Sequence, residues 1–331
     1  ASTTATVDNN RNSGATYIVN SNGNGDYDAQ SLTGTSATDD DVVVVEEDGA
    51  YSSATVNNNL DIVAATGDTP AVEPSGAVAI DANDNNVLID GLDLVGDTDY
   101  DVVTQSGTSS LTIPSSTVEV NNDNSGGDTS FGIDHDSTSD LTVQQTTFNG
   151  PFSQFSAGDN PDDAFGIDVG GGISSTVTIT DNSFQDLRTG IQTRDNIDTA
   201  DINRNSFNNI FASAIYILDG AEAISDETYT ISENTLTNVG EGIDVDATNT
   251  NGIDLSQISI NENDFSNADA DFREGSLGFA VQTNTEGSTT NSLDASNNYW
   301  GDSTGPSGQG PGAGDAVDTE VTFRPFYTDS S

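Results

Sequence analysis

The chain has 331 residues, with 55 Asp and Glu against 6 Lys and Arg, and its formal net charge is −49. A surface of this sign excludes nucleic acid and anionic membrane surfaces as partners, and no apolar run approaches the roughly 18 residues that membrane insertion needs. Self-repulsion on this scale strains a fold in ordinary salt, whereas at about 1 M salt the Debye length falls to about 3 Å. The composition therefore predicts a halophile, in particular a halophilic archaeon. The alternative is an acidic, calcium-binding surface protein of low-salt origin.

Three further features of the sequence concern its location. Cysteine is absent, so disulfides give no information on the compartment. The sequence begins at Ala1 without Met, which we interpret as a mature N-terminus left by signal-peptide removal. With 34 Asn and 77 Ser or Thr, chance would place about eight Asn-X-Ser/Thr glycosylation acceptors in the chain, yet none occurs. We therefore expect an extracellular or cell-surface protein whose bare surface packs against neighbouring subunits.

Residues 1–61 are expected to form the N-terminal coils and their cap. Short β-type stretches at 15–19, 42–45 and 60–63 are separated by turns rich in Gly, Asn and Asp. The segment 1–7 alternates Thr with Ala and Val, which is typical of an extended strand. We expect this segment to supply a strand to the sheet edge of a neighbouring copy.

Residues 62–296 contain repeated copies of one sequence motif. An aliphatic residue is followed three positions later, usually by Asn, five positions later by Phe or Leu, and then by a small residue and Ile. The alternation indicates strands with one buried face, and the repeat spacing indicates a solenoid. We therefore predict an all-β chain in one domain, a single right-handed parallel β-helix of about nine or more coils. The first aliphatic positions are Ile62, Ile89, Ile113, Val143, Ile179, Ile202, Ile231, Ile260 and, less cleanly, Ala295.

Equivalent residues of successive coils should stack about 4.8 Å apart and build the coil rather than catalyse. An internal apolar ladder is expected from Phe184, Phe207, Leu236 and Phe265. An amide ladder at a turn is expected from Asn182, Asn205, Asn234 and Asn263.

Residues 297–331 are expected to close the helix, and several motifs along the chain resemble those of a known family. These motifs are Gly23–Tyr27, Val42–Val45, Gly49–Tyr51, Asn59–Val63, Asn297–Pro306 and Val321–Phe326. With them, the chain resembles the right-handed parallel β-helix repeat proteins, the pectate-lyase-like and copper-maturation-like secreted family. The resemblance implies the fold over nearly the whole chain but no single activity, because that family mixes lyases, hydrolases, esterases and structural proteins. It also implies a capping helix near 29–37, which the Ser/Thr-rich sequence there does not favour.

The residue after each small-residue and Ile pair should point outward from the coil. This exterior file consists of Asp134, Asp168, Gln192, Tyr216 and Asp244. Asp134 and Asp168 lie one coil apart, at roughly 5 Å, a separation that suits a calcium ion or acid–base chemistry. Arg194 follows two residues after Gln192 and completes the candidate site. The resemblance implies that such a patch could bind an acidic sugar through calcium, as lyases of this fold do.

Other residues carry weaker signals. His135 is predicted to be an inward or end-of-strand residue rather than a base, because its file continues as mostly apolar residues. The run 160–163 is faintly similar to the paired aspartates of polygalacturonase-like enzymes. Arg188 and Arg204 join Arg194 as the arginines of neighbouring coils that a lyase or esterase of this fold would place beside its substrate.

Insertions fall in one turn of the repeat, at 121–131, 149–164 and 266–277. Because equivalent turns stack, these insertions should lie on one side of the solenoid, which is often the working face.

Two function classes follow from the sequence. The first is a non-catalytic extracellular protein, a self-associating surface or filament-forming subunit whose partners are copies of itself and which requires no cofactor. The second is a secreted polysaccharide lyase or hydrolase, or a carbohydrate-binding protein, whose partner is a polysaccharide held on a calcium-linked acidic face around Asp134, Asp168 and Arg194.

Overall fold

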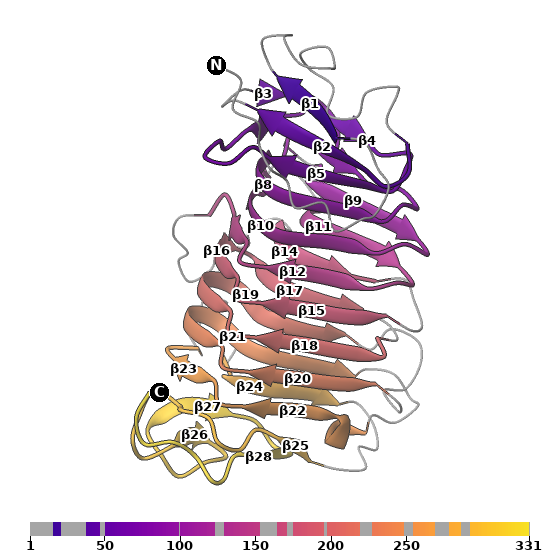
Figure 1. Cartoon of the computed structure of the whole chain (residues 1–331). Helices are drawn as coiled ribbons and strands as arrows, with labels where there is room; N and C mark the ends of the chain where they lie inside the picture. Colours follow the sequence, from indigo (N-terminus) through magenta and orange to yellow (C-terminus); the bar gives the residue numbers. More distant parts are fainter. Residues whose placement is uncertain are drawn as a thin grey trace.

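The computed structural model describes residues 16–20, 38–46, 50–98, 100–122, 129–152, 164–170, 175–194, 197–218, 227–247, 254–268, 278–285 and 292–330. The strands in these ranges form one continuous sheet in which every pairing is parallel, wound into stacked coils (Figure 1). The predicted fold class, an all-β parallel β-helix, is confirmed. A single 3₁₀ turn, η1 (Leu255–Gln257), is the helical element of the described residues. The segments 1–7 and 29–37 lie outside them.

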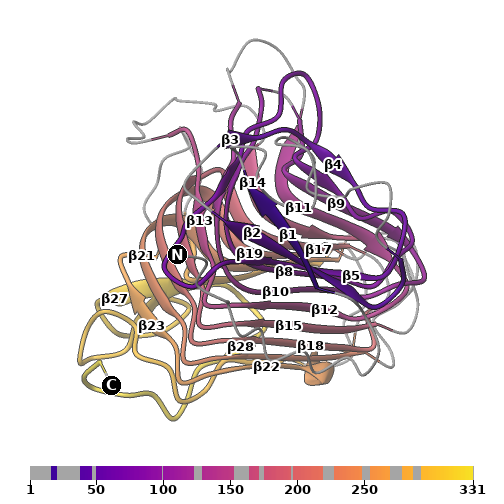
Figure 2. The same cartoon turned by 45° about the horizontal axis from the view of Figure 1, so that its top comes forward.

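Each coil has three sides, which we call faces A, B and C (Figure 2). Face A consists of β1 (Thr16–Asn20), β2 (Asp41–Glu46), β5 (Leu60–Ala64), the first halves of β8 (Val87–Val95) and β10 (Leu111–Glu119), β12 (Leu141–Gln144), β15 (Thr176–Thr180), β18 (Thr199–Asn203), β20 (Thr228–Ser232), β22 (Ile258–Asn261), β25 (Leu293–Asp294) and β28 (Val321–Thr322).

Faces B and C complete each coil. Face B consists of β3 (Ala50–Tyr51), β6 (Ala71–Val72), the second halves of β8 and β10, β13 (Thr147–Asn149), β16 (Ser183–Leu187), the first halves of β19 (Ser206–Leu218) and β21 (Thr235–Ala247), and β23 (Asp264–Ser266). Face C consists of β4 (Ala54–Thr55), β7 (Ile80–Asp81), β9 (Val103–Gly107), β11 (Ser130–Ser137), β14 (Ala164–Val169), β17 (Thr189–Arg194), the second halves of β19 and β21, β24 (Val281–Thr285) and β27 (Gly314–Val317), to which β26 (Pro306–Gly308) adds a short closing strand.

The register of face A follows the predicted aliphatic file. Val143 pairs with Ile179, and the file continues through Ile202 to Ile231 and Ile260. All of these side chains are fully buried. Because side chains alternate along a strand, this register places the residues between them on the outer surface.

Aromatic side chains stack along the interior of face B. The ring centroids of Phe148 and Phe184 lie 4.7 Å apart and those of Phe184 and Phe207 lie 4.9 Å apart, with nearly parallel planes. The file continues in register through Leu236 to Phe265. These spacings match the distance between paired strands, so the rings pack as the backbone hydrogen bonds dictate.

A ladder of buried amides marks the corner between faces A and B. The side-chain nitrogen of Asn182 donates to Asn205 Oδ1 at 3.0 Å, and the same bond repeats from Asn205 to Asn234 and from Asn234 to Asn263. Each side-chain nitrogen also donates to a backbone carbonyl one coil back, as in Asn205 to Ile179 O at 2.8 Å. The ladder therefore satisfies amides that would otherwise be costly to bury.

Each ladder amide follows a residue with left-handed backbone. The φ angle is 60° at Asp181, 53° at Arg204, 57° at Glu233 and 58° at Glu262. Such a conformation costs about 1–2 kcal/mol for an L-residue. The amide bonds on the following residue offset this cost and hold the chain at the bend.

The Asn-Tyr-Trp motif near the C-terminus is one more copy of the repeat. Asn298 lies three residues after Ala295 and accepts the bond from Asn263 at 3.0 Å, which ends the amide ladder. Trp300 lies five residues after Ala295, is fully buried, and stacks on Phe265 with centroids 5.0 Å apart. The motif therefore closes the core.

Candidate functional site

Face C brings the predicted site residues into one outer file. Asp134 on β11 pairs in register with Asp168 on β14, which pairs with Gln192 on β17. The neighbours of Asp134 along the strand, Ile133 and His135, are fully buried in the interior, so Asp134 and Asp168 lie on the outer side. Although it lies on the outer side, Asp168 is 0% exposed.

Arg194, also on β17, forms an ion pair with Asp168. Its Nε donates to Asp168 Oδ1 at 3.0 Å, and its Nη2 donates to Oδ2 of the same carboxylate. Gln192 Nε2 donates to Asp168 Oδ1 at 2.9 Å. Burial opposes both charges, but this two-pronged hydrogen bonding raises the pKa of Arg194 and keeps the guanidinium charged. The site thus contains an ion pair in which Asp168 is fully buried and Arg194 is partly exposed.

Two further carboxylates surround the pair, and the sequence analysis missed both. Asp136 Oδ1 lies 4.0 Å from Arg194 Nη2. Asp101 precedes β9 on the neighbouring coil and accepts a hydrogen bond from the backbone nitrogen of Phe131 at 2.9 Å. Alternation from Asp134 would have placed Asp136 on the same side, whereas Asp101 lies outside any alternating run. We call Asp101, Asp134, Asp136 and Asp168 with Arg194 the acidic cluster.

Asp134 is the titrating member of the acidic cluster. Burial, followed by the charges of Asp136, Asp101 and Asp168, raises its pKa to about 7. Its Oδ1 is buried and has no hydrogen-bond partner. Burial also raises the pKa of Asp101. One arginine among four aspartates cannot neutralise them all, so the acidic cluster takes up a proton as the pH falls through about 7.

The arrangement does not fit calcium at Asp134 and Asp168. Within the described ranges, no three Asp, Glu or His side chains converge to hold a metal ion. Both oxygens of Asp168 already accept from Arg194, which places a positive charge where the calcium ion would have to lie. Calcium binding at these residues stays a prediction that this geometry does not support.

The other residues singled out in the sequence lie apart from the acidic cluster. His135 is fully buried, as predicted, and its Nε2 lies 3.1 Å from Ser139 O, so this nitrogen donates and burial lowers the pKa of the ring. Arg204 is bound to Asp181 by two hydrogen bonds of 2.8 and 2.9 Å, and Arg188 is half-buried after β16. The run 160–163 and most of the insertions lie outside the described residues.

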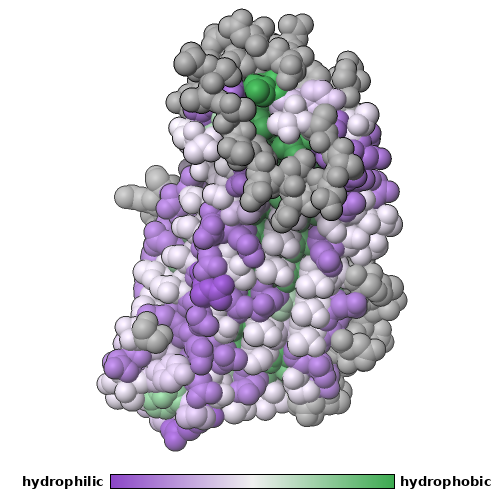
Figure 3. Space-filling view, viewed as in Figure 1, coloured by the Kyte–Doolittle hydropathy of each residue, from purple (hydrophilic) through white to green (hydrophobic). Residues whose placement is uncertain are grey.

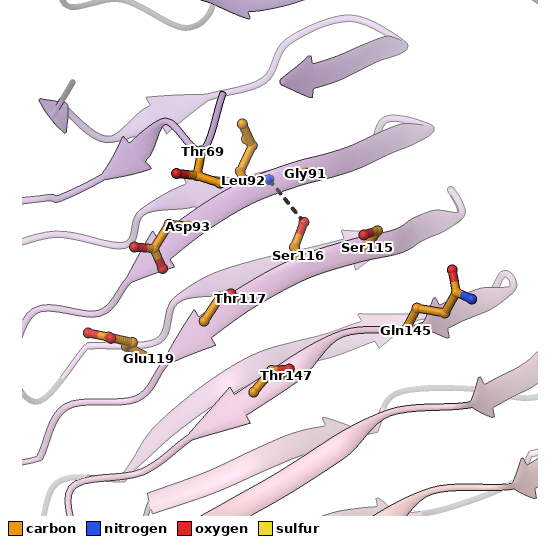
Figure 4. A pocket seen from close by; sticks show the side chains of 10 residues that line it. All are labelled: Thr69, Gly91, Leu92, Asp93, Ser115, Ser116, Thr117, Glu119, Gln145 and Thr147. Atoms are coloured by element: carbon orange, nitrogen blue, oxygen red, sulfur yellow. Dashed lines mark hydrogen bonds between the residues drawn. The ribbon is translucent and has the colours of Figure 1, made fainter. Parts of the chain in front are cut away.

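A polar groove of about 480 Å³ crosses face B near its N-terminal end (Figure 4). It was not predicted, because it lies where the corner between faces A and B changes type. Gly91 on β8 has a φ of 75°, and the pairing of β10 with β8 is irregular at Ser115, whereas the regular amide corner begins only after Gln145. The groove contains no aromatic or basic side chain among its lining residues, which are Thr69, Gly91, Leu92, Asp93, Ser115, Ser116, Thr117, Glu119, Gln145 and Thr147.

Two carboxylates define the chemistry of the groove. Asp93 pairs in register with Thr117, and Glu119 lies two residues further along β10. Asp93 Oδ1 is buried without a partner, and burial, with a contribution from Glu73, raises the pKa of Asp93. The groove can therefore accept and donate hydrogen bonds, but none of its lining residues offers a cation to an acidic sugar.

Faces A and B differ from face C in their outer charge. On face B, from β13 to β21, Asp186 is the charged side chain among those that retain exposure on the described strands, and the amide of Asn209 donates to it. The alternating outward side chains are uncharged; they are Thr147, Asn149, Ser183, Gln185, Ser206, Asn208, Thr235 and Thr237. On face A, from β10 to β22, the outward side chains that retain exposure include a single carboxylate, Asp201; they are Thr112, Thr142, Gln144, Thr176, Thr178, Thr199, Asp201, Thr228, Thr230, Ser232, Ser259 and Asn261. We call this set on face A the hydroxyl face.

Figure 3 views the molecule from the side of face A. Much of the surface below the grey atoms is pale, and the strongly hydrophilic groups gather in separate purple patches.

Comparison of the chain with protein-family models, with curated proteins and with solved structures gave no match. Among the described residues, no helix has the length and apolar character needed to cross a bilayer.

Proposed function

We propose that this chain is an extracellular, non-catalytic structural protein, a self-associating surface or filament-forming subunit of a halophile. The observation that carries the proposal is the segregation of charge. A chain of net charge −49 repels its own copies, so close contact is least unfavourable where the surface lacks carboxylates. Faces A and B offer such a surface along much of the solenoid, whereas face C does not.

The state of the acidic cluster also favours a structural role. Lyases and esterases that act on acidic sugars need a cation that is free to contact the substrate. Arg194 is the cation of the acidic cluster, and its Nε and Nη2 are both used by Asp168. Arg204 is paired with Asp181, and Arg324 lies over the rings of Phe323 and Phe326 at 5.7 and 6.0 Å.

The remaining parts of the proposal rest on the sequence. The motif resemblance to secreted pectate-lyase-like and copper-maturation-like repeat proteins supports an extracellular location. The charge balance supports a halophilic archaeon as the source, and the absence of glycosylation acceptors supports a surface that packs against copies of itself. No cofactor is required for this role.

Self-association in concentrated salt tests the proposal. Sedimentation velocity at about 1 M salt and above, where the Debye length is about 3 Å, should show larger species that increase with protein concentration. Electron micrographs of the same samples should show regular fibres or arrays. A single monomeric species at every salt and protein concentration would rule the proposal out.

A second candidate is a secreted polysaccharide hydrolase, lyase or carbohydrate-binding protein. It is favoured by the polar groove with Asp93 and Glu119, and by Asp134, whose pKa of about 7 suits proton transfer near neutral pH. Release of reducing ends from neutral and acidic polysaccharides, compared between the wild type and the Asp93→Asn and Asp134→Asn variants, tests this candidate. Activity that either substitution abolishes would support it.

A further inference from the structure

The most regular surface of the molecule is the hydroxyl face. Strands β12, β15, β18, β20 and β22 pair without any register shift. Their outward side chains therefore form a grid with about 4.8 Å between strands and roughly 6.6 Å between alternate residues of one strand. A flat grid of this kind can lie closely against a second flat grid, which a bulged or strongly curved face cannot.

We propose that the hydroxyl face is the surface through which two copies of this chain meet. The proposal rests on the proposed function and names the contact that makes self-association possible. The occupant is a second copy, which presents its own hydroxyl face.

The chemistry of the hydroxyl face is self-complementary. A hydroxyl group both donates and accepts, and so do the amides of Gln144 and Asn261, so the same surface can pair with itself across a two-fold axis. Carboxylates only accept, so a face of carboxylates cannot do this. Within the described residues, the hydroxyls of Thr142, Thr178 and Thr230 have no side-chain hydrogen bond, which leaves them available.

The charge around the hydroxyl face fits the same partner. Asp201 is its single carboxylate, and the side-chain amide of Asn203 donates to it. Asp140 at one border accepts from the backbone nitrogen of Thr176 at 2.9 Å, and Asp181 at the opposite border is paired with Arg204. Exposed carboxylates of Asp198, Glu233 and Glu262 also lie along these borders. Two copies that meet here therefore bring carboxylates together at the rim of the contact, whereas contact through face C would oppose two acidic clusters at its centre.

The area of the hydroxyl face limits the size of the contact. From β10 to β22 it measures about 29 Å by 17 Å, or roughly 500 Å² in projection for each copy. Two such faces together bury on the order of 1,000 Å², near the lower end of specific interfaces. We therefore expect an association that depends on protein concentration and on salt, rather than an obligate dimer.

Paired charge substitutions test the proposal. Thr178→Asp with Thr230→Asp places four carboxylates in the contact between two copies, and Thr147→Asp with Thr235→Asp makes the same change in net charge on face B. At high salt, the apparent dissociation constant of the first variant should rise by about tenfold or more, while that of the second stays within about twofold of the wild type. Melting curves should show that both variants are folded.

A charge-reversal variant keeps the test independent of folding defects. Thr178→Lys with Thr230→Lys, mixed with the Asp variant, should form mixed dimers more tightly than either variant associates alone. If both Asp variants associate like the wild type, or if only the face B variant fails to associate, the hydroxyl face is not the contact although self-association stands. A wild type that is monomeric under all conditions would instead contradict the proposed function itself.

Discussion

Faces A and C are built on the same coils and by the same alternation of side chains, yet their outer surfaces differ in kind. On face A, successive strands place Thr142, Thr178, Asp201 and Thr230 on a flat grid with one carboxylate. On face C, the equivalent file holds Asp134 and Asp168. Asp168 is buried beneath Arg194, and Asp134 lacks a partner for one oxygen. The fold of the solenoid therefore determines which side chains point outward. The chemistry of those outward residues determines whether a face is suited to binding another molecule.

The salt concentration should have the largest effect on the stability of the protein. Lowering it from about 1 M to about 0.1 M lengthens the Debye length from about 3 Å to about 10 Å, and the melting temperature should fall by more than any single substitution causes. Screening acts on carboxylates and not on hydroxyls. Asp136→Asn on face C should therefore recover part of the loss, whereas Thr142→Asn on face A should recover none. A melting curve that does not change with salt would contradict the hypersaline interpretation.

The buried ion pair should be the most sensitive single position. Arg194→Ala leaves Asp168 buried without its cation, and we expect a loss of about 2–4 kcal/mol, below that for a fully buried pair because Arg194 is 36% exposed. Arg204→Ala removes an exposed pair and should cost no more than about 1 kcal/mol. Denaturant unfolding of the two variants measures both losses. Equal losses would show that face C does not hold a buried charge pair.

The amide ladder is buried, so its contribution to stability does not depend on the charge of the outer faces. Asn234→Ala removes the acceptor of the backbone and side-chain nitrogens of Asn205 and one of the donors to Asn263 Oδ1, and should cost about 1–3 kcal/mol. Asn208→Ala, on the exposed surface of face B, should cost less than about 0.5 kcal/mol. Thermal unfolding provides the measurement, and similar costs would argue against the ladder as a source of stability.

The pH dependence of stability should come from face C. In the folded state the pKa of Asp134 is raised to about 7 from an ordinary value of 3.8, so between these values the folded state binds more protons than the unfolded state. This contribution is fully present below pH 3.8 and is lost as the pH rises toward 7. Asp134→Asn should flatten this slope and, above pH 7, stabilise the fold by about 1–2 kcal/mol, a value reduced for solvent screening. An unchanged pH profile would contradict the assignment.

The smallest effect is expected on the hydroxyl face. Thr142→Ser removes one outward methyl group and keeps the hydroxyl, so the free energy of unfolding should change by less than about 0.5 kcal/mol. The matched change Thr235→Ser on face B should give the same result. A loss above about 1 kcal/mol at Thr142 alone would mean that this face already packs against part of its own chain.

The sequence predicted the parts of the molecule that repeat. The spacing from Ile179 to Ile202 and Ile231 is enough to derive the coil, because the strand pairing and the interior both follow from it. The closing motif could have been predicted in the same way, because Ala295, Asn298 and Trp300 have the spacing of the repeated sequence motif.

The parts that do not repeat could not be read from the sequence. Alternation places Asp168 on the outer side but does not say that Arg194 covers it. Asp101 joins the acidic cluster from outside any strand, and the groove depends on the left-handed backbone of Gly91 and an irregular pairing at Ser115. These features arise from contacts between coils, which a pattern within one coil does not contain.

Electron cryomicroscopy of the wild-type chain assembled at high salt tests the central claim most directly. The account predicts ordered assemblies built from pairs of copies that meet through face A, while the acidic cluster on face C stays in contact with solvent. Dispersed monomeric rods, or assemblies in which copies meet through face C, would contradict it.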